Sequence, residues 1–274
     1  MSSSDSSGLI SSANRASGRK ATAPSGFPRP RSTEVRLNLY LARCGCGARR
    51  ACDRLVREGK VTVNGRVVNL PSFRVHPHTD DVRVEGLKVR PAPPRYYVFY
   101  KPRGVLSTMA DPQGRPCVGD YIRRLGERVF PVGRLDRDSE GLLLLTNDGD
   151  FAERILHPRH HVARVYQVWT DRMLTAAERQ RITRGLRCDG RVLRAAELKR
   201  MGREGKSFVY RIVLREGRNR QIRRLMRQLG VRILRLRRTA IGAITLGRLE
   251  PGEIAPLDWH RIGYLRPAAA DQSG

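Results

Sequence analysis

A single aspartate in an arginine-rich turn carries the most specific chemical signal of the chain. The turn reads Gly-Arg-Leu-Asp-Arg-Asp-Ser-Glu-Gly over residues 133–141, so Asp136 follows Arg134 by two positions. It lies between two strand-like runs at 129–132 and 142–145. Positive charge nearby favours the ionised form of a carboxylate, and an ionised carboxylate can act as a nucleophile or base without a cofactor. The alternative is that these residues only form a well-capped turn with no catalytic role.

Two further stretches hold side chains that could share this chemistry. Tyr166 follows Arg164 by two positions at the start of a strand-like run, where a tyrosine more often serves packing than catalysis. The second stretch opens a helical pattern near residue 220 and carries four arginines: Arg218, Arg220, Arg223 and Arg224. Guanidinium groups at a helix N-terminus form a site for phosphate or carboxylate. A solvated basic helix is the simpler alternative.

The charge of the chain points to a polyanionic partner. It has 54 Lys and Arg against 26 Asp and Glu, with a formal net charge of +28 and a pI of about 11.3. Only six of the basic residues are lysines. Arginine contacts phosphate in a bidentate manner and stacks on bases, which favours nucleic acid. A bias in genome composition would produce part of the same excess.

Cysteine usage and hydropathy exclude several classes of protein. The five cysteines are an odd number, which argues against a secreted disulfide framework and for a reducing compartment. No apolar run approaches the roughly 18 residues that span a bilayer, so we expect no membrane segment. Neither the spacing of Cys44, Cys46 and Cys52 nor the histidines at 157, 160 and 161 match a zinc pattern. We therefore predict no metal site.

Composition divides the chain into five parts. Residues 1–33 are rich in Ser, Ala, Gly, Pro and Arg, which predicts a disordered basic extension. An organelle transit peptide has a similar composition and is the alternative. An ordered unit is expected at 34–84, a proline-containing linker at 85–94, a larger domain at 95–262 and a disordered tail at 263–274.

The first ordered unit reads as two short helices followed by a small sheet. Apolar residues between 37 and 56 have helical spacing on both sides of Gly45 to Gly47, and alternation then follows around Asn64-Gly65, a hairpin turn. Arginines fall on the outward helix faces, among them Arg43, Arg49 and Arg50. This pattern suits RNA docking, although solvation of a helix face would account for it equally well.

The larger domain alternates strand-like and helical patterns. Strand-like runs are at 96–100, 129–132, 142–145, 165–169, 208–214 and 233–236, and helical patterns at 118–125, 150–156, 176–185 and 220–229. The prediction for the whole chain is therefore an α+β fold, in which a mixed, mainly antiparallel sheet is flanked by helices.

These motifs resemble two known families. The residues at 36–42, 49–51, 55–56, 59–61 and 63–65 look like an S4 RNA-binding domain. From about Tyr96 to Trp259 the chain resembles the RsuA/RluB family of pseudouridine synthases. Five features carry the second resemblance in the family's order: the strand and Lys-Pro-x-Gly turn at 97–104, Gly-Arg-Leu-Asp at 133–136, Asn-Asp-Gly at 147–149, Arg164-x-Tyr166, and the arginine-rich helix start at 217–224.

The resemblance implies roles for the residues at these positions. Asp136 would be the essential catalytic carboxylate, acting at C1′ or C6 of a uridine or by assisting proton removal at C2′. Arg223 would pair with it, Tyr166 would stack on the base and take part in proton transfer, and Ile222 would form an apolar wall. RNA contacts are implied for Arg134, Arg164, Arg218, Arg220 and Lys101, and for Arg43, Arg49 and Arg50 in the S4 domain. The family usually has lysine where this chain has Arg164, and a guanidinium keeps the charge while it changes the reach and the donor geometry.

The expected activity is isomerisation of a uridine in folded ribosomal RNA to pseudouridine, without cofactor or metal. The residues of the motifs resemble those of the large-subunit enzymes and so favour 23S rRNA as the substrate. The alternatives are a small-subunit 16S enzyme, a non-catalytic ribosome-associated RNA-binding protein, and a DNA-binding module. We expect a monomer in the bacterial cytoplasm whose partner is ribosomal RNA, with organellar targeting as the alternative location.

Overall fold

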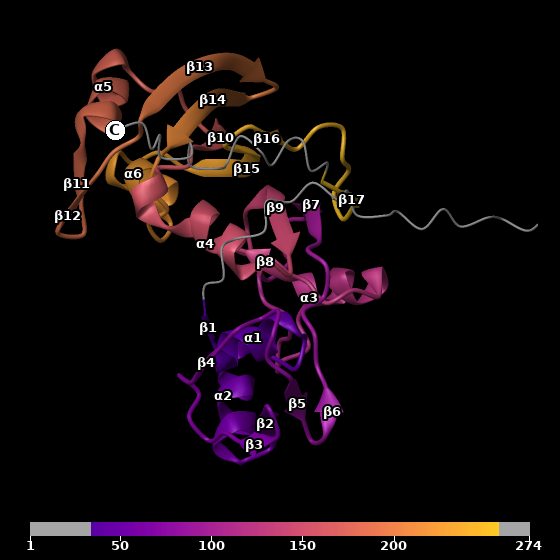
Figure 1. Ribbon diagram of the computed structural model, residues 1–274. Helices are drawn as coiled ribbons and strands as arrows, with labels where there is room; N and C mark the ends of the chain where they lie inside the picture. Colours follow the sequence, from indigo (N-terminus) through magenta and orange to yellow (C-terminus); the bar gives the residue numbers. More distant parts are fainter. Residues whose placement is uncertain (1–33, 258–274) are drawn as a thin grey trace, which may run out of the picture. The chain divides into compact units, whose positions relative to one another are not determined.

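The computed structural model describes residues 34–257 (Figure 1). The extension expected at 1–33, the tail expected at 263–274 and the last five residues expected for the larger domain lie outside the described residues. Within 34–257, no helix is long and apolar enough to cross a membrane.

The N-terminal part is built from two helices and short strands. Helices α1 (Leu37–Arg43) and α2 (Arg49–Arg57) follow β1 (Val35–Arg36), which pairs with β4 (Arg74–Val75). The strands β2 (Val61–Val63), β3 (Arg66–Val67), β5 (Val82–Val84) and β6 (Leu87–Lys88) form a sheet in the order β3-β2-β5-β6. Leu37, Leu41, Cys52 and Val56 are fully buried against Val61. The helical spacing and the hairpin were therefore predicted correctly.

The larger part contains one long sheet in the order β13-β14-β10-β15-β9-β7-β17. Its strands are β7 (Tyr96–Lys101), β9 (Glu140–Thr146), β10 (Arg164–Thr170), β13 (Glu197–Glu204), β14 (Ser207–Leu214), β15 (Ile233–Ile241) and β17 (Ile254–Pro256). β8 (Phe130–Val132) pairs with β9, and β16 (Ile244–Thr245) pairs with β15. Only the β9–β15 pairing is parallel among these described strands. The α+β class with a mainly antiparallel sheet is confirmed.

Helices and a hairpin complete this part. They are α3 (Val118–Ile122), α4 (Gly149–Leu156), α5 (Ala176–Arg184), α6 (Gln221–Gln228), two 3-10 turns (Arg123–Leu125 and Pro158–His160), and the hairpin of β11 (Leu186–Cys188) with β12 (Arg191–Leu193). The Asp148 side chain caps α4 by accepting the amides of Asp150 and Phe151. Helix α6 packs Ile222, Leu225 and Met226 into a core shared with β10, β14 and β15. This packing fixes the start of α6 beside the sheet.

The parallel contact between β9 and β15 requires a glycine. Gly141 pairs with Arg238 and has a φ of +102°, and a Cβ at this position would lie 2.3 Å from the Arg238 carbonyl oxygen. Any other residue would therefore push the two strands apart. The glycine lets the turn that precedes β9 lie beside β15.

Candidate active site

Hydrogen bonds hold Asp136 in the turn between β8 and β9. The Ser107 hydroxyl donates to the Leu135 carbonyl oxygen at 2.7 Å and accepts the Leu135 amide at 3.1 Å. The Ser139 amide donates to the Asp136 carbonyl oxygen at 3.0 Å. The Asp136 side chain is 29% exposed, so it is reachable from solvent while its backbone is fixed.

Two guanidinium groups from the start of α6 face the Asp136 carboxylate. Arg223 Nε lies 3.4 Å from Oδ2, and Arg220 Nη1 lies 3.8 Å from the same oxygen. Arg223 Nη2 also donates to the Asp138 carbonyl oxygen at 3.0 Å and to Ser139 Oγ at 3.1 Å. Arg223 is therefore held against the turn at Asp138 and Ser139, and its Nε faces the carboxylate of Asp136.

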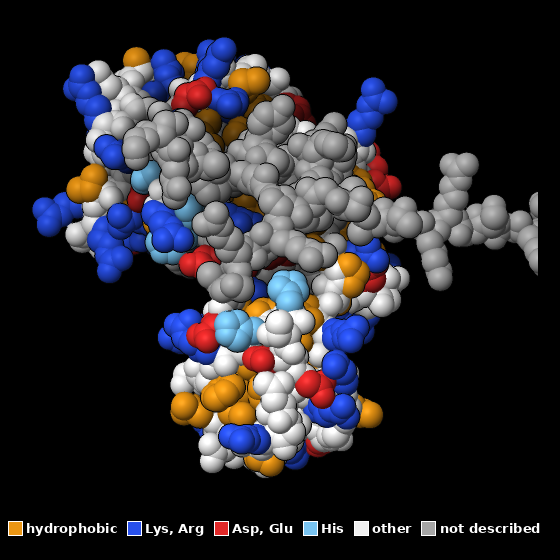
Figure 2. All heavy atoms as spheres, in the orientation of Figure 1, with side chains coloured by type: hydrophobic (Ala, Val, Ile, Leu, Met, Phe, Trp, Pro, Cys, Tyr) orange, Lys and Arg blue, Asp and Glu red, His pale blue; other side chains and the backbone are white. Residues whose placement is uncertain are grey.

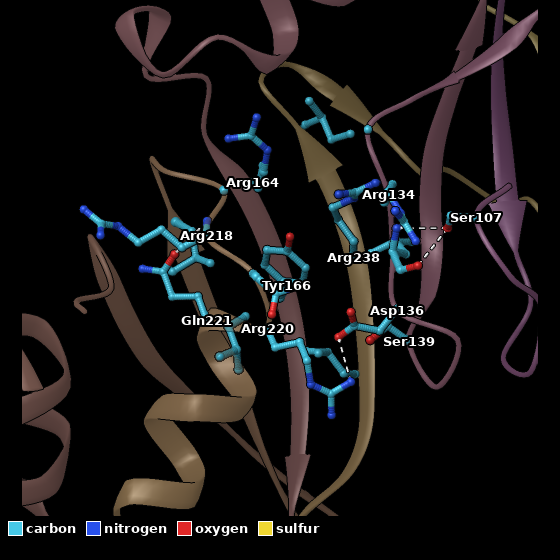
Figure 3. Close-up of a pocket in the computed structure, with 18 of the residues that line it drawn as sticks. Ser107, Arg134, Asp136, Ser139, Arg164, Tyr166, Arg218, Arg220, Gln221 and Arg238 are labelled. Atoms are coloured by element: carbon cyan, nitrogen blue, oxygen red, sulfur yellow. Dashed lines mark hydrogen bonds and ion pairs between the residues drawn. The ribbon is translucent and has the colours of Figure 1, made fainter. Parts of the chain in front are cut away.

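The carboxylate opens into a cavity of about 590 Å³. Among the described residues, Asp136 is its single acidic lining residue, and its basic lining residues are seven arginines: Arg134, Arg137, Arg164, Arg218, Arg220, Arg223 and Arg238. Figure 3 shows Asp136, Tyr166 and Arg238 reaching into this space from the turn, from β10 and from β15. The excess of positive charge suits an anionic ligand, and the volume exceeds that of one pyrimidine ring.

Most of the residues predicted for the site lie around this cavity. Ile222 is 3% exposed and contributes an apolar surface beside Asp136. Tyr166 is half-buried on β10. Arg134 and Arg220 are exposed at the rim, as is Arg218, whose Nε donates to Glu216 at 2.8 Å. The structure thus brings together side chains that are up to 89 positions apart in the sequence, from 134 to 223.

Arg164 occupies a different environment from the rim arginines. It is 8% exposed and donates from Nη2 to the Ile155 carbonyl oxygen at 3.0 Å and from Nη1 to the Val162 carbonyl oxygen at 3.2 Å. No described carboxylate forms an ion pair with it. Burial lowers the pKa of this guanidinium, and the charge of Arg238 adds to the lowering.

The expected RNA contact of Lys101 is not supported by its position. The side chain is fully buried and does not line the cavity. Its Nζ donates to the carbonyl oxygens of Pro102 and Ser139, each at 2.8 Å. The Lys-Pro turn places this lysine behind the loop at 137–139, where it bonds to backbone. Lys101 therefore supports the loop that carries Asp136.

The S4-type arginines lie on the first two helices. Arg49 and Arg50 are exposed in the first turn of α2, and Arg43 is partly exposed in the last turn of α1. None of the three lines the cavity around Asp136. Their contact with RNA stays a prediction.

Sequence reasoning missed three residues of the site: Ser107, Ser139 and Arg238. The hydroxyl of Ser107 bonds to the backbone of Leu135 and that of Ser139 accepts from Arg223, and no spacing rule reveals either contact. Arg238 is one of four arginines between 232 and 238, and the pattern could show which of them share a strand face only after β15 had been placed. Within 34–257, no cluster of three His, Cys, Asp or Glu residues could hold a metal ion.

Comparison with known proteins identifies the families of both parts of the chain. A sequence profile of the RNA pseudouridylate synthase family matches residues 95–228, and an S4 domain profile matches residues 35–81. An uncharacterized RNA pseudouridine synthase of Aquifex aeolicus is 37% identical over 233 residues, covering 85% of this chain and 94% of the relative. The ribosomal large subunit pseudouridine synthase B of Bacillus subtilis is 36% identical over 236 residues, covering 85% of this chain and 96% of that protein.

A solved structure supports the same family. A crystal structure of a pseudouridylate synthase superposes with a TM-score of 0.60 at 26% identity, covering 85% of this chain and all of that chain. The match extends over both the helix pair with its small sheet and the long mixed sheet. The chain belongs to the RNA pseudouridine synthases that carry an N-terminal S4 domain.

Proposed function

We propose that this protein isomerises one uridine of large-subunit 23S ribosomal RNA to pseudouridine, with Asp136 as the catalytic carboxylate. One observation carries the proposal: within residues 34–257, Asp136 is the only acidic residue lining a cavity with seven arginines, and the cavity is large enough for an extracted pyrimidine. The Bacillus subtilis relative bears the name of a large-subunit enzyme, which supports the choice of 23S rRNA.

The reaction exchanges one bond of the base for another. The C1′–N1 bond of the uridine breaks, the base turns within the cavity, and C5 forms a bond to C1′. The proton at C5 then leaves and N1 gains one, so the atoms balance without a co-reactant. Asp136 serves this sequence by attack at C1′, by attack at C6, or by taking a proton from C2′.

The neighbours of Asp136 have separate tasks in this proposal. Arg223, 3.4 Å from the carboxylate, keeps it charged and oriented. Tyr166 stacks on the extracted base and moves the proton at C5, while Ile222 closes the apolar side. Arg134 enters the RNA stack where the base has left, a step that costs a few kcal/mol.

RNA capture depends on the basic surface in this proposal. Residues 34–84 form the docking domain and residues 95–262 the catalytic domain, and Arg43, Arg49 and Arg50 hold phosphates of a folded RNA. Arg218 and Arg220 track the backbone at the cavity rim. Lys and Arg side chains are spread over the described face shown in Figure 2. The protein acts as a monomer in the bacterial cytoplasm.

Mapping of pseudouridines in 23S and 16S rRNA tests the proposal. Cells that lack the protein should lose one modification in 23S rRNA, and the wild-type gene should restore it while the Asp136→Asn gene should not. Loss in 16S rRNA would instead assign a small-subunit enzyme. Unchanged maps of both RNAs would favour a non-catalytic RNA-binding protein.

A further inference from the structure

Arg238 is a buried cation whose hydrogen bonds are incomplete. The residue is 4% exposed, and its Nε donates to the Leu142 carbonyl oxygen at 2.7 Å. Its Nη2 is buried and has no hydrogen-bond partner among the described residues. An unpaired N–H of a charged group is costly to bury. A group that is absent from the free protein would complete these bonds.

The position of Arg238 indicates where that group would lie. On adjacent antiparallel strands Arg238 pairs directly with Tyr166, so the two side chains stand next to each other on one face of the sheet. Figure 3 shows both at the cavity, with the Asp136 turn beside them. A base stacked on Tyr166 would therefore have one edge at the Arg238 guanidinium.

Arg164 adds a second buried positive charge to the same wall. It precedes Tyr166 by two residues on β10 and so shares the face of the sheet that bears Tyr166 and Arg238. The carboxylate of Asp136 already faces Arg223 and Arg220. Neither Arg164 nor Arg238 forms an ion pair with any described acidic residue. The wall behind Tyr166 is thus preorganised for negative charge.

Resting uracil is neutral, and it acquires negative charge only during the reaction. When the C1′–N1 bond breaks, its electron pair stays with the base, and the charge spreads from N1 to the carbonyl oxygens at C2 and C4. The base leaves with the electron pair whether Asp136 acts at C1′, at C6 or through C2′. In a C6 adduct the charge reaches only the C2 carbonyl oxygen, because the saturated C6 interrupts conjugation from N1 to C4. Fixed donors aimed at developing charge stabilise a transition state more than a ground state.

We propose that Arg238, supported by the charge of Arg164, donates to a carbonyl oxygen of the extracted uracil and stabilises the anion formed when the glycosidic bond breaks. This inference rests on the proposed isomerase function. Arg238 is thereby a catalytic residue of the reaction. The uracilate then re-forms a bond to C1′ through C5, and the guanidinium returns to its resting contacts.

The alternative occupant, a phosphate of the RNA backbone, fits the rim better. The Arg220 side chain at the rim is 50% exposed and the Arg218 side chain 45%, so backbone phosphates reach them without entering the cavity. Arg238 is 4% exposed and lies beside the tyrosine. The burial of Arg238 and its position beside Tyr166 both favour the base, rather than a phosphate, as its ligand.

Single-turnover measurements on an RNA fragment with the mapped uridine test the inference. Arg238→Met should lower the rate of glycosidic cleavage at saturating enzyme about 100-fold, as loss of one oxyanion donor does elsewhere, with RNA affinity nearly unchanged. A 5-fluorouridine substrate gives a more acidic leaving base that depends less on external stabilisation. With it, the loss caused by Arg238→Met should shrink to a few-fold.

Two further variants separate catalysis from folding. Arg238→Gln keeps a donor for the Leu142 carbonyl oxygen but lacks the charge, so it should reproduce the loss even if the methionine variant folds poorly. Arg237→Met removes an arginine from the same strand that does not line the cavity, where its Nε pairs with Glu140 at 2.9 Å. Its ratio of uridine to 5-fluorouridine rates should match that of the wild type.

The outcomes are distinct for the two claims. A wild-type protein that forms no pseudouridine would refute the proposed function itself. An active wild type with a fully active Arg238→Gln variant would refute this inference alone. A loss confined to RNA affinity, equal for both substrates, would assign Arg238 to the phosphate backbone and overturn it as well.

Discussion

Lys101 donates from Nζ to the carbonyl oxygen of Ser139 across 2.8 Å, joining the end of β7 to the loop that carries Asp136. The same ammonium bonds to the Pro102 carbonyl oxygen and lies 3.5 Å from that of Arg137. The buried Nζ of Lys101 thus donates to three backbone oxygens, one directly after β7 and two in the loop that carries Asp136. This contact explains why β7 ends in a lysine.

The buried lysine predicts a pH dependence of stability. Burial lowers the pKa of Lys101 to about 8, although nearby acidic groups oppose the shift. Between pH 8 and 10.5 the unfolded chain binds this proton and the folded chain does not, so the lysine's contribution to stability rises with pH. Relative to Lys101→Met, the wild type should gain up to about 3 kcal/mol over this window in denaturant unfolding. A pH-independent difference would contradict it.

Replacing Asp136 by asparagine should abolish turnover without weakening RNA capture. Phosphate contacts supply most of the affinity, and the substitution removes a negative charge from a basic cavity. The check is pseudouridine formation on rRNA transcripts beside equilibrium binding of the same RNA. Full turnover by Asp136→Asn would remove this residue from the mechanism.

Tyr166→Phe separates two roles of the tyrosine. The substitution keeps the ring that would stack on the base and removes the hydroxyl that would move a proton. We expect unchanged RNA affinity and a single-turnover rate about 100-fold lower, the range typical of general acid–base groups. A variant as fast as the wild type would leave stacking as the residue's task.

The sequence predicted Asp136 and its turn because both lie in one local motif. Its neighbour Arg223 is 87 positions away, and no periodicity could have joined the two. The family resemblance supplied that pairing, and the structure places Arg223 Nε 3.4 Å from the carboxylate. The residues around Asp136 were enough to predict an ionised carboxylate in a turn. The approach of Arg223 to that carboxylate depends on how α6 packs against the sheet.

Strand β13 shows why part of the fold was missed. The residues Glu197–Glu204 are mostly exposed and polar, since this strand lies at the edge of the sheet. An edge strand of this kind carries no apolar alternation to detect. The RNA contact expected of Lys101 rested on the family resemblance alone. The burial of this side chain depends on the loop that covers it, which no local pattern reveals.

The S4-type arginines should account for part of the salt dependence of binding. Arg49 and Arg50 are exposed in the first turn of α2. Replacing both by methionine should weaken RNA binding. Log affinity should then fall less steeply with log salt, with a slope smaller in magnitude by about one to two. Arg83→Met is the matched control, because Arg83 is already paired with Asp81 at 2.9 Å. Equal slopes for the wild type and the double variant would exclude this helix from RNA contact.

Arg220 combines a strained backbone with a place beside the carboxylate. Its φ is +49°, in the left-handed region that glycine adopts without strain, and it immediately precedes α6. The same geometry brings its Nη1 to 3.8 Å from Asp136. A non-glycine residue in this conformation costs about 1 kcal/mol or more. The strain is thus located at a residue that faces the Asp136 carboxylate.

Arg220→Gly and Arg220→Ala form a matched pair that exposes this strain. Both substitutions remove the guanidinium, but only glycine relieves the backbone strain. The free energy of unfolding of the glycine variant should therefore be about 1 kcal/mol higher than that of the alanine variant. Both should lose RNA affinity and rate to the same extent, because Asp136 keeps Arg223 at 3.4 Å as its remaining cation. Denaturant unfolding and single-turnover rates of the two proteins provide the measurement. Equal stabilities would show that the left-handed conformation at Arg220 carries no strain, and a lower rate for the glycine variant alone would show that the rigid turn itself positions α6.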